Sequence, residues 1–270
     1  MSARVLVNGD EGARIAANDR GLLYGDGLFE TILFANGAAP LWLRHVHRLL
    51  RGCERLGLPA PDPELLAREA GQVVVGMQRA VVRMTLTRGT GARGYAPPQE
   101  AECTRIVAAF DPPFIPTDWY ARGIRVRFGE LRLATQPRLA GIKHLNRLEQ
   151  VLAQAEWQDE SIVDGLMLDT EGEVVSSTAS NVFLVRGGVL VTPDLRFSGV
   201  LGVMRAEVLR LAKELGIAVS EEPVWPRDVE AASEVFITNA VRGIRSVTEL
   251  GALRWTDAPI ADRLREALDF

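Results

Sequence analysis

The chain has 270 residues, of which 47% are hydrophobic and 24% charged, with a net charge of −4 and a pI near 5.6. This length supports an ample hydrophobic core and favours two compact lobes over one. The mildly acidic balance argues against nucleic-acid binding, and no apolar run is long enough to span a bilayer. Cys53 and Cys103 form no CxxC motif and have no histidine cluster beside them, so we expect reduced thiols, a cytoplasmic protein and no metal site.

The N-terminal part is predicted to be a small lobe of strands and helices. Its expected strands are residues 5–8, 28–34, 40–43, 80–87 and 105–110, and its expected helices are roughly 44–57 and 62–77. Asn36-Gly37 between two apolar runs is a strong hairpin signal. Asp62 followed by Pro63 is typical of a helix start, with the aspartate as N-cap.

The C-terminal part is predicted to be larger and rich in strands. Its expected strands are residues 124–128, 165–168, 181–185, 189–192, 218–224, 234–237 and 244–248, with helices near 145–157, 201–215 and 258–268. The proline-dense run 111–116 separates two structured regions and indicates a linker. The predicted organisation is therefore an N-terminal domain over residues 1–112, a linker over 113–120 and a C-terminal domain over 121–270. This mixture of strands and helices predicts the α+β class.

Only two of the 31 Lys and Arg residues are lysines, and their surroundings differ. Lys213 lies near the polar end of an amphipathic helix closed by Gly216, where we expect a solvated charge. Lys143 instead lies in an apolar junction between a strand-like run and a helix. An amine can lose its proton and condense with a carbonyl, which the permanently protonated guanidinium cannot do. Lys143 is therefore either a structural residue or the group that binds a carbonyl compound.

Two glycine-rich segments have the freedom to bring the backbone close to a ligand or a neighbouring subunit. Residues 19–27 contain three glycines and two aspartates, but they do not form a dinucleotide-binding fingerprint. Residues 88–95 carry Arg88, Arg93 and Tyr95. Because a guanidinium matches the geometry of a carboxylate, Arg93 is a candidate for binding an acidic substrate, the alternative being a solvated basic loop.

These segments resemble those of the fold-type IV pyridoxal-phosphate enzymes, which include branched-chain and D-amino-acid aminotransferases and aminodeoxychorismate lyases. The resemblance covers essentially the whole chain and rests on residues 19–31, 45–49, 88–95, 139–150, 181–183, 202–205 and 238–240. It implies a two-domain fold with a small N-terminal α/β lobe, a larger strand-rich C-terminal lobe and pyridoxal 5′-phosphate in the cleft. The regions around Lys143 and Arg93 are most similar to the lyases.

The resemblance implies a set of cofactor-binding residues. Lys143 would hold the cofactor aldehyde and then serve as acid and base at the reacting carbon. Arg48 matches the phosphate-binding arginine of the family. The remaining cofactor positions that the resemblance implies are Ser176, Asn181, Val203, Met204, Thr238, Asn239 and Ala240. Of these, Val203 and Met204 begin a helix whose N-terminus suits a phosphate dianion.

The resemblance also implies a substrate site and a partner. Phe29 and Thr31 share one face of a strand that lines the substrate pocket in the resembling enzymes, and Thr31 is counted with Lys143 among the catalytic residues. Arg93, with Tyr95 beside it, matches an arginine that reaches in from the partner subunit to bind the substrate carboxylate. A homodimer with a shared active site and a small-molecule substrate is implied, without a nucleic-acid or membrane partner.

One position departs from the family pattern. Ser176 stands five residues before Asn181, where the family has a glutamate that binds the pyridinium nitrogen. Serine cannot hold that proton by charge, so the ring should be a poorer electron sink. An elimination that creates an aromatic ring depends less on this sink than transamination does. We therefore expect a lyase that forms 4-aminobenzoate and pyruvate from 4-amino-4-deoxychorismate for folate synthesis; the alternatives are an aminotransferase of the D-amino-acid or branched-chain type and a catalytically silent member.

Overall fold

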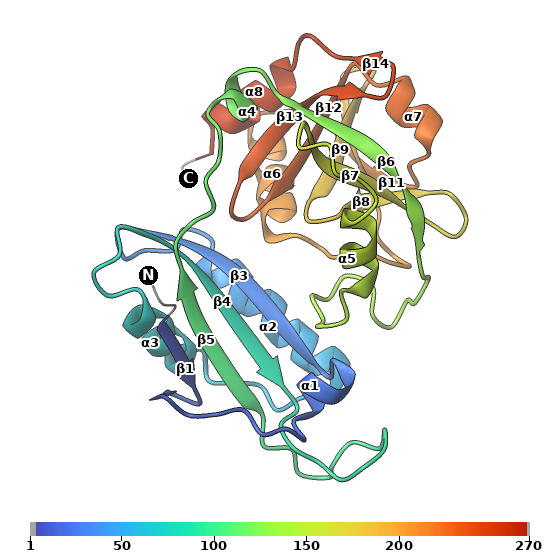
Figure 1. Cartoon of the computed structure of the whole chain (residues 1–270). Coiled ribbons are helices and arrows are strands. Elements are labelled where there is room, and N and C mark those ends of the chain that lie inside the picture. Colours follow the sequence, from blue (N-terminus) through green and yellow to red (C-terminus); the bar gives the residue numbers. More distant parts are fainter. Residues whose placement is uncertain (1–3, 269–270) are drawn as a thin grey trace. The chain divides into compact units, whose positions relative to one another are not determined.

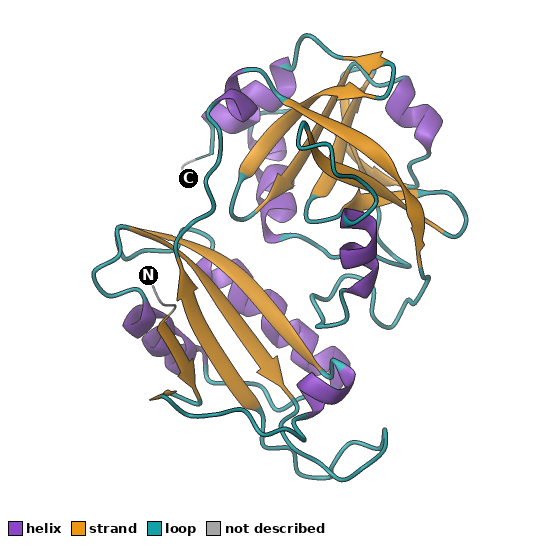
Figure 2. Cartoon of the chain, viewed as in Figure 1, coloured by secondary structure: helices purple, strands orange, loops and turns teal. Residues whose placement is uncertain are grey.

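The computed structural model describes residues 4–268, which fall into two compact units. The first unit contains the chain up to Pro113 together with Ile142–Asn146, and the second contains Phe114–Gly141 and the chain from Arg147 on. Each unit combines strands with helices, as Figures 1 and 2 show, in agreement with the α+β class. No helix within residues 4–268 is long and apolar enough to cross a membrane.

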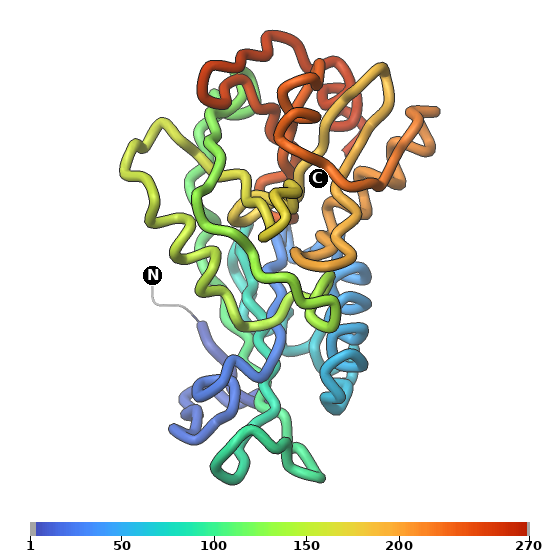
Figure 3. Tube along the Cα trace, turned by 90° about the vertical axis from the view of Figure 1, so that its right-hand side faces the viewer, coloured from blue at the N-terminus to red at the C-terminus, as the bar shows by residue number. Residues whose placement is uncertain are grey.

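The first unit is built on a five-stranded antiparallel sheet with the strand order β2-β1-β5-β4-β3. The strands are β1 (Arg4–Val7), β2 (Asp10–Glu11), β3 (Gly27–Ala35), β4 (Arg79–Thr87) and β5 (Thr104–Phe110). Helices α2 (Trp42–Leu56) and α3 (Pro63–Val73) lie on the same face of this sheet (Figures 1 and 3). A Cβ atom at Gly52 would come within 2.7 Å of Leu28, so α2 approaches β3 closely because this position lacks a side chain.

One local prediction for this unit is wrong, and one short helix was not predicted. The turn at Asn36-Gly37 is present, but residues 40–43 form no strand, because Trp42 already begins α2 and its apolar neighbours follow the helical period toward Val46. No helix was predicted in the glycine-rich segment before β3. It contains the short helix α1 (Arg20–Tyr24), whose N-cap Asp19 accepts a hydrogen bond from Gly21 N and whose C-cap is left-handed.

The second unit is built on a mixed sheet with the order β11-β10-β9-β12-β13-β6-β7-β8, to which β14 adds beside β13. Its strands are β6 (Ile124–Leu133), β7 (Ile162–Asp169), β8 (Val174–Ser177), β9 (Asn181–Arg186), β10 (Val189–Pro193), β11 (Val219–Glu222), β12 (Glu234–Asn239), β13 (Gly243–Leu250) and β14 (Leu253–Arg254). Its helices are α4 (Asp118–Ala121), α5 (Leu148–Gln154), α6 (Val203–Glu214), α7 (Pro226–Glu230) and α8 (Pro259–Glu266).

The core of the second unit lies on both faces of this sheet. On one face, residues such as Val182, Leu184 and Ile237 form an apolar cluster that is 0% exposed at these three positions. On the other face, Phe183 and Phe236 stack with their centroids 5.0 Å apart and pack against α6 and α8. Alternate residues of β9 and β12 point to opposite faces, and the central residues of both strands, 182–185 and 235–237, are all apolar, which is typical of a sheet covered on both sides.

Candidate active site

Strand pairing fixes the backbone of Lys143 beside the first residues of β3. Lys143 O accepts a hydrogen bond from Phe29 N at 2.9 Å, and Leu145 N donates to Gly27 O at 3.0 Å. The segment Ile142–Asn146 therefore lies antiparallel along the free edge of β3 and belongs to the first unit, whereas the sequence placed Lys143 in the C-terminal domain. The Lys143 Nζ atom lies 4.3 Å from the centroid of the Phe29 ring.

A second cation lies beside the same aromatic ring. Arg83 on β4 is the cross-strand neighbour of Thr31, and its Cζ atom lies 4.2 Å from the Phe29 centroid. Phe29 and Thr31 share one face of β3, as expected, so this face presents an aromatic ring, a hydroxyl and two positive charges. Arg83 was not predicted from the sequence. The available signal was a charge in the middle of the largely apolar strand β4.

On the other face of β3, a buried carboxylate orients Arg48. Arg48 Nε donates to Glu30 Oε1 at 2.8 Å, its Nη2 donates to Glu30 Oε2, and His45 Nδ1 lies 2.6 Å from the same Oε2. Burial raises the pKa of Glu30, but the charge of Arg48 and the hydrogen bonds from Arg48 and His45 outweigh it and lower that pKa to about 2. An ionised Glu30 accepts, so His45 Nδ1 carries the proton. The bidentate pair thus sets the direction of the Arg48 guanidinium.

The two arginines of the loop after β4 differ in burial. Arg88 is buried, and it donates to Asp26 Oδ2 at 2.8 Å, to Gly57 O at 2.9 Å and to Leu56 O at 2.8 Å. Arg93 and Tyr95 are exposed instead, Tyr95 to 86%. Of the two arginines, only Arg93 is therefore available to a ligand or a second chain.

In the second unit, Asn181 brings three distant segments together. It pairs with Thr238 across β9 and β12, and its Nδ2 donates to Val200 O at 2.9 Å. A Cβ atom at Gly202 would lie 2.0 Å from Asn181 Oδ1, so only glycine fits there. The start of α6 and the end of β12 thus meet at Asn181, as the cofactor set implied by the resemblance requires.

This meeting point has the donors that a phosphate needs. Helix α6 begins at Val203 and Met204 with no side-chain cap and no acidic residue in its first turn, which leaves backbone N–H groups and the positive end of the helix dipole. Thr238 is 1% exposed, and its Oγ1 has no hydrogen-bond partner within residues 4–268. A buried donor of this kind is costly unless a ligand or water satisfies it, so the set fits a bound phosphate.

The side chain of Asn239 forms its hydrogen bonds within the protein. Its Oδ1 accepts from Val241 N at 3.0 Å and from Arg242 N at 2.8 Å, and its Nδ2 donates to Ser180 Oγ at 3.1 Å. These bonds shape the turn that contains Ala240. What this turn can offer a ligand is therefore its backbone.

Ser176 lies on β8, a strand that the sequence analysis missed. It stands opposite Met167 of β7 and is 9% exposed. Glu171 and Glu173, the acidic residues nearest before it, lie in the preceding turn, where Asp169 Oδ1 accepts from both of their N–H groups. The strand therefore presents a hydroxyl at the position where the family has a carboxylate.

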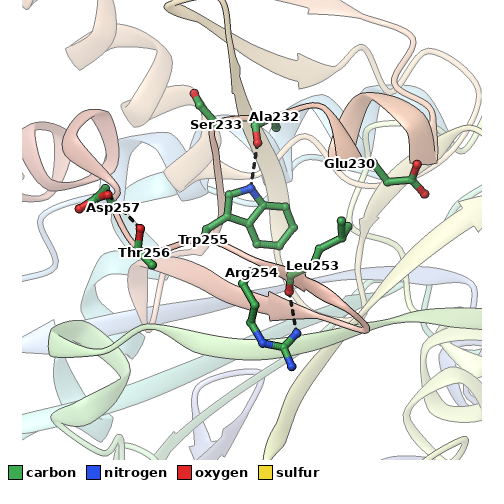
Figure 4. A pocket seen from close by; sticks show the side chains of 8 residues that line it. All are labelled: Glu230, Ala232, Ser233, Leu253, Arg254, Trp255, Thr256 and Asp257. Atoms are coloured by element: carbon green, nitrogen blue, oxygen red, sulfur yellow. Dashed lines mark hydrogen bonds between the residues drawn. The ribbon is translucent and has the colours of Figure 1, made fainter.

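The second unit also has a surface cavity of about 300 Å³ near the end of β14. Figure 4 shows its lining, in which the Trp255 indole donates to Ala232 O at 2.9 Å. Its lining residues are Glu230, Ala232, Ser233, Leu253, Arg254, Trp255, Thr256 and Asp257. No residue predicted for cofactor or substrate binding is among them, so this cavity is not the candidate active site.

Comparison with known proteins decides the family. A model of amino-transferase class IV proteins matches residues 27–250. The chain belongs to this family. This class IV member is 34% identical to an aminodeoxychorismate lyase of Vibrio harveyi, covering 91% of each chain. It is 33% identical to a putative branched-chain-amino-acid aminotransferase of Methanocaldococcus jannaschii, covering 92% of this chain and 88% of the relative.

A solved structure shows the same fold. The crystal structure of 4-amino-4-deoxychorismate lyase from Pseudomonas aeruginosa matches with a TM-score of 0.93 and 43% identity, covering 98% of this chain and 100% of that one. The expected fold type IV is therefore confirmed. Pyridoxal 5′-phosphate is the cofactor of the class IV family, which confirms the cofactor prediction. The roles of individual residues stay predictions.

Proposed function

We propose that this class IV family member is a 4-amino-4-deoxychorismate lyase, which releases pyruvate and leaves 4-aminobenzoate. The similarity to the Pseudomonas aeruginosa lyase, 43% identity over 98% of the chain, carries this proposal. The reaction removes a proton from the amine-bearing carbon and breaks the adjacent carbon–oxygen bond. The residues must therefore bind a dicarboxylate, orient it and move one proton.

In this proposal, the cofactor supplies the electron sink. Lys143 would hold the cofactor through its amine and would serve as the base that takes the proton from the substrate carbon. Arg48, oriented by Glu30, would bind the phosphate together with uncharged hydrogen-bond donors. These donors are the N–H groups of Val203 and Met204, the Thr238 hydroxyl and the backbone of Asn239 and Ala240. Asn181 holds the α6 terminus in place, and Ser176 would offer the pyridine ring an uncharged hydroxyl.

The substrate carries two carboxylates, and each needs a charged donor, because burying an unpaired carboxylate costs several kcal/mol. Arg93, aided by Tyr95, binds one carboxylate. Arg83 binds the other, since its guanidinium lies beside the Phe29 ring that Lys143 also faces. Phe29 and Thr31 line the space next to Lys143.

Arg93 acts from the partner subunit in this proposal, so the active form is a homodimer. Leu22 and Leu23 on α1 are 69% and 51% exposed. On α5, Leu148, Val151 and Leu152 are 76%, 59% and 59% exposed and follow one helical face. Exposed apolar groups of this kind favour a protein interface. The cytoplasmic location expected from the sequence is part of the proposal and is compatible with the two free cysteines.

An aminotransferase is the second candidate, supported by the Methanocaldococcus jannaschii relative at 33% identity. Ser176 favours the lyase, because transamination needs a stronger electron sink than an elimination that forms an aromatic ring. A catalytically silent member of the fold is the third reading.

Product analysis distinguishes the three candidates. The purified protein, with pyridoxal phosphate bound, is incubated with 4-amino-4-deoxychorismate, and we expect equal amounts of pyruvate and 4-aminobenzoate. Transfer of an amino group from an amino acid to a keto acid without these products would identify an aminotransferase, and absence of both reactions would identify a silent member. Lys143→Ala is expected to abolish product formation, whereas Lys213→Ala, which removes the only other lysine, serves as the matched control.

A further inference from the structure

We propose that Arg20 is a positioning residue for substrate binding: with Tyr24, it holds the backbone of residues 94–96 and so fixes where Arg93 and Tyr95 point. The inference rests on the proposed role of Arg93 and extends it to a buried residue in another part of the chain. Arg20 acts through the loop and does not itself contact the substrate.

Arg20 binds three successive carbonyl groups of this loop. Its Nη1 donates to Gly94 O at 3.0 Å and to Ala96 O at 3.2 Å, and its Nη2 donates to Tyr95 O at 2.9 Å. Its Nε donates to Asp26 Oδ2 at 2.9 Å, and the residue is 4% exposed. A planar guanidinium presents its donors in a fixed fork, so these bonds determine the path of the loop backbone.

Tyr24 holds the same loop from the other end of α1. Its hydroxyl accepts a hydrogen bond from Gly94 N at 3.3 Å, and its ring meets the Tyr95 ring edge-on with the centroids 5.4 Å apart. The Arg20 guanidinium lies over the Tyr24 ring, 5.0 Å from its centroid. The loop therefore has a fixed backbone, although the side chains of Arg93 and Tyr95 are exposed.

A loop whose backbone is fixed before the substrate arrives can bind a carboxylate more tightly than a mobile loop. An arginine on a mobile loop loses conformational entropy when it binds a carboxylate, and this loss weakens affinity. If the loop is already fixed by Arg20, that cost is met when the protein folds. Removal of the Arg20 donors would release three carbonyls to water and let the loop adopt other paths.

Arg88 provides a matched control within the same cluster. It donates to the same Asp26 Oδ2 atom and to two carbonyls, but those belong to Leu56 and Gly57 at the end of α2. Burial raises the pKa of Asp26, but hydrogen bonds from Arg88 and Arg20 outweigh it and leave that pKa below its ordinary value. Both arginines thus contribute to stability through one carboxylate, and only Arg20 holds residues 94–96.

The test compares Arg20→Met, Arg20→Lys, Tyr24→Phe and Arg88→Met in the cofactor-bound protein. We measure KM and kcat for 4-amino-4-deoxychorismate, cofactor content by absorbance, and the rate of tryptic cleavage after Arg93. Arg20→Met is expected to raise KM by about tenfold or more, with kcat changed by less than about threefold. The reason is that the loop of the variant must be ordered when substrate binds, which weakens binding and leaves the chemical step unchanged. Cofactor content is expected to stay at the parent level, and cleavage after Arg93 is expected to become faster.

The other variants separate positioning from stability. Arg88→Met is expected to lower Tm, with KM and cleavage after Arg93 as in the parent. Arg20→Lys is expected to recover part of the KM loss, because an ammonium group donates to carbonyls without the fork. Tyr24→Phe removes one hydroxyl and is expected to raise KM slightly and to speed cleavage, so it decides the question if Arg20→Met does not fold.

Two results would overturn parts of this picture separately. If Arg93→Ala raises KM while Arg20→Met and Tyr24→Phe leave both KM and cleavage unchanged, the positioning inference is wrong and the proposed function stands. If Arg93→Ala itself leaves KM unchanged, the proposed role of Arg93 is wrong, and the positioning inference for substrate binding is wrong with it.

Discussion

At the scale of single residues, the proposed chemistry of this protein depends on one amine. Lys143 and Lys213 are its only lysines, and Lys213 is exposed in the last turn of α6, as expected. Lys143 is half-buried, and its backbone is bonded to Phe29 at the edge of β3. An arginine at position 143 keeps the positive charge and much of the volume, but it cannot condense with an aldehyde.

Lys143→Arg is therefore expected to abolish the visible absorbance of the bound cofactor, whereas Lys213→Arg is expected to keep it. Borohydride reduction of the parent followed by peptide mapping should place the label on Lys143. A label on Lys213 would show that the assignment is wrong.

Ser176→Glu tests the electron sink at the residue scale. A carboxylate at this place would hold a proton on the pyridine nitrogen, so transfer of the amino group from D-alanine to the cofactor is expected to rise about tenfold or more, since a charged hydrogen bond contributes about 1.5–3 kcal/mol. The elimination rate is expected to change by less. Ser177→Glu on the same strand is no suitable control, because Ser177 Oγ donates to Asp164; Ser176→Ala serves instead. If the parent already transaminates D-alanine freely, Ser176 does not select the reaction.

At the scale of elements, β3 organises the first unit because its two faces have different partners. The face with Phe29 and Thr31 lies beside Arg83 and carries Lys143 along its edge. The face with Glu30 packs on α2, where the buried carboxylate orients Arg48. One strand thereby positions the lysine proposed to hold the cofactor, through pairing along its edge, and the arginine proposed to bind the phosphate, through the residue on its opposite face.

The pair Glu30–Arg48 predicts an acid-sensitive contact between β3 and α2. The pKa of Glu30 falls from its ordinary 4.5 to about 2 on folding, so its contribution to stability is complete above pH 4.5 and is lost as the pH falls toward 2. Glu30→Gln is expected to lower the free energy of unfolding at pH 7 by about 3–5 kcal/mol, because it removes the buried carboxylate of the ion pair with Arg48. Between pH 4.5 and 2 the variant is expected to lose less further stability than the parent, as urea unfolding at each pH would show.

The control for this prediction is an exposed ion pair. Asp118 and Arg122 are 64% and 80% exposed, so Asp118→Asn is expected to change the free energy of unfolding by less than about 1 kcal/mol. An equal acid response of Glu30→Gln and the parent would mean that Glu30 does not titrate as proposed.

At the scale of the whole molecule, the proposed dimer makes catalysis depend on two chains. Arg93→Ala and Lys143→Ala are each expected to be inactive or nearly so as homodimers. After subunit exchange, a mixed dimer holds one site with both residues intact, so about a quarter of the parent activity per dimer is the expected upper limit for random mixing in which half of the dimers are mixed. Absence of recovery after verified exchange would show that Arg93 acts within its own chain or not at all.

The sequence by itself determined the chemistry of this protein and the type of most elements. Only a few residue types can condense with an aldehyde or bind a carboxylate, so Lys143 and Arg93 were candidates without coordinates, and the resemblance to fold-type IV enzymes implied their roles. Apolar periodicity over long runs likewise predicted α2, α6 and the longer strands of both units. Short elements such as α1 and β8 escaped, because four or five residues carry too little periodic signal.

Only the tertiary structure decided which of these residues meet. Arg20 and the carbonyl of Gly94 are 74 positions apart, and Asn181 reaches Thr238 through strand pairing. The sequence placed Arg88 and Arg93 in one loop, and only the tertiary structure showed that Arg88 is buried against Asp26 whereas Arg93 is exposed. Residue type limits what a side chain can do. Long-range pairing, which local sequence does not encode, determines which partner satisfies it and therefore what it does.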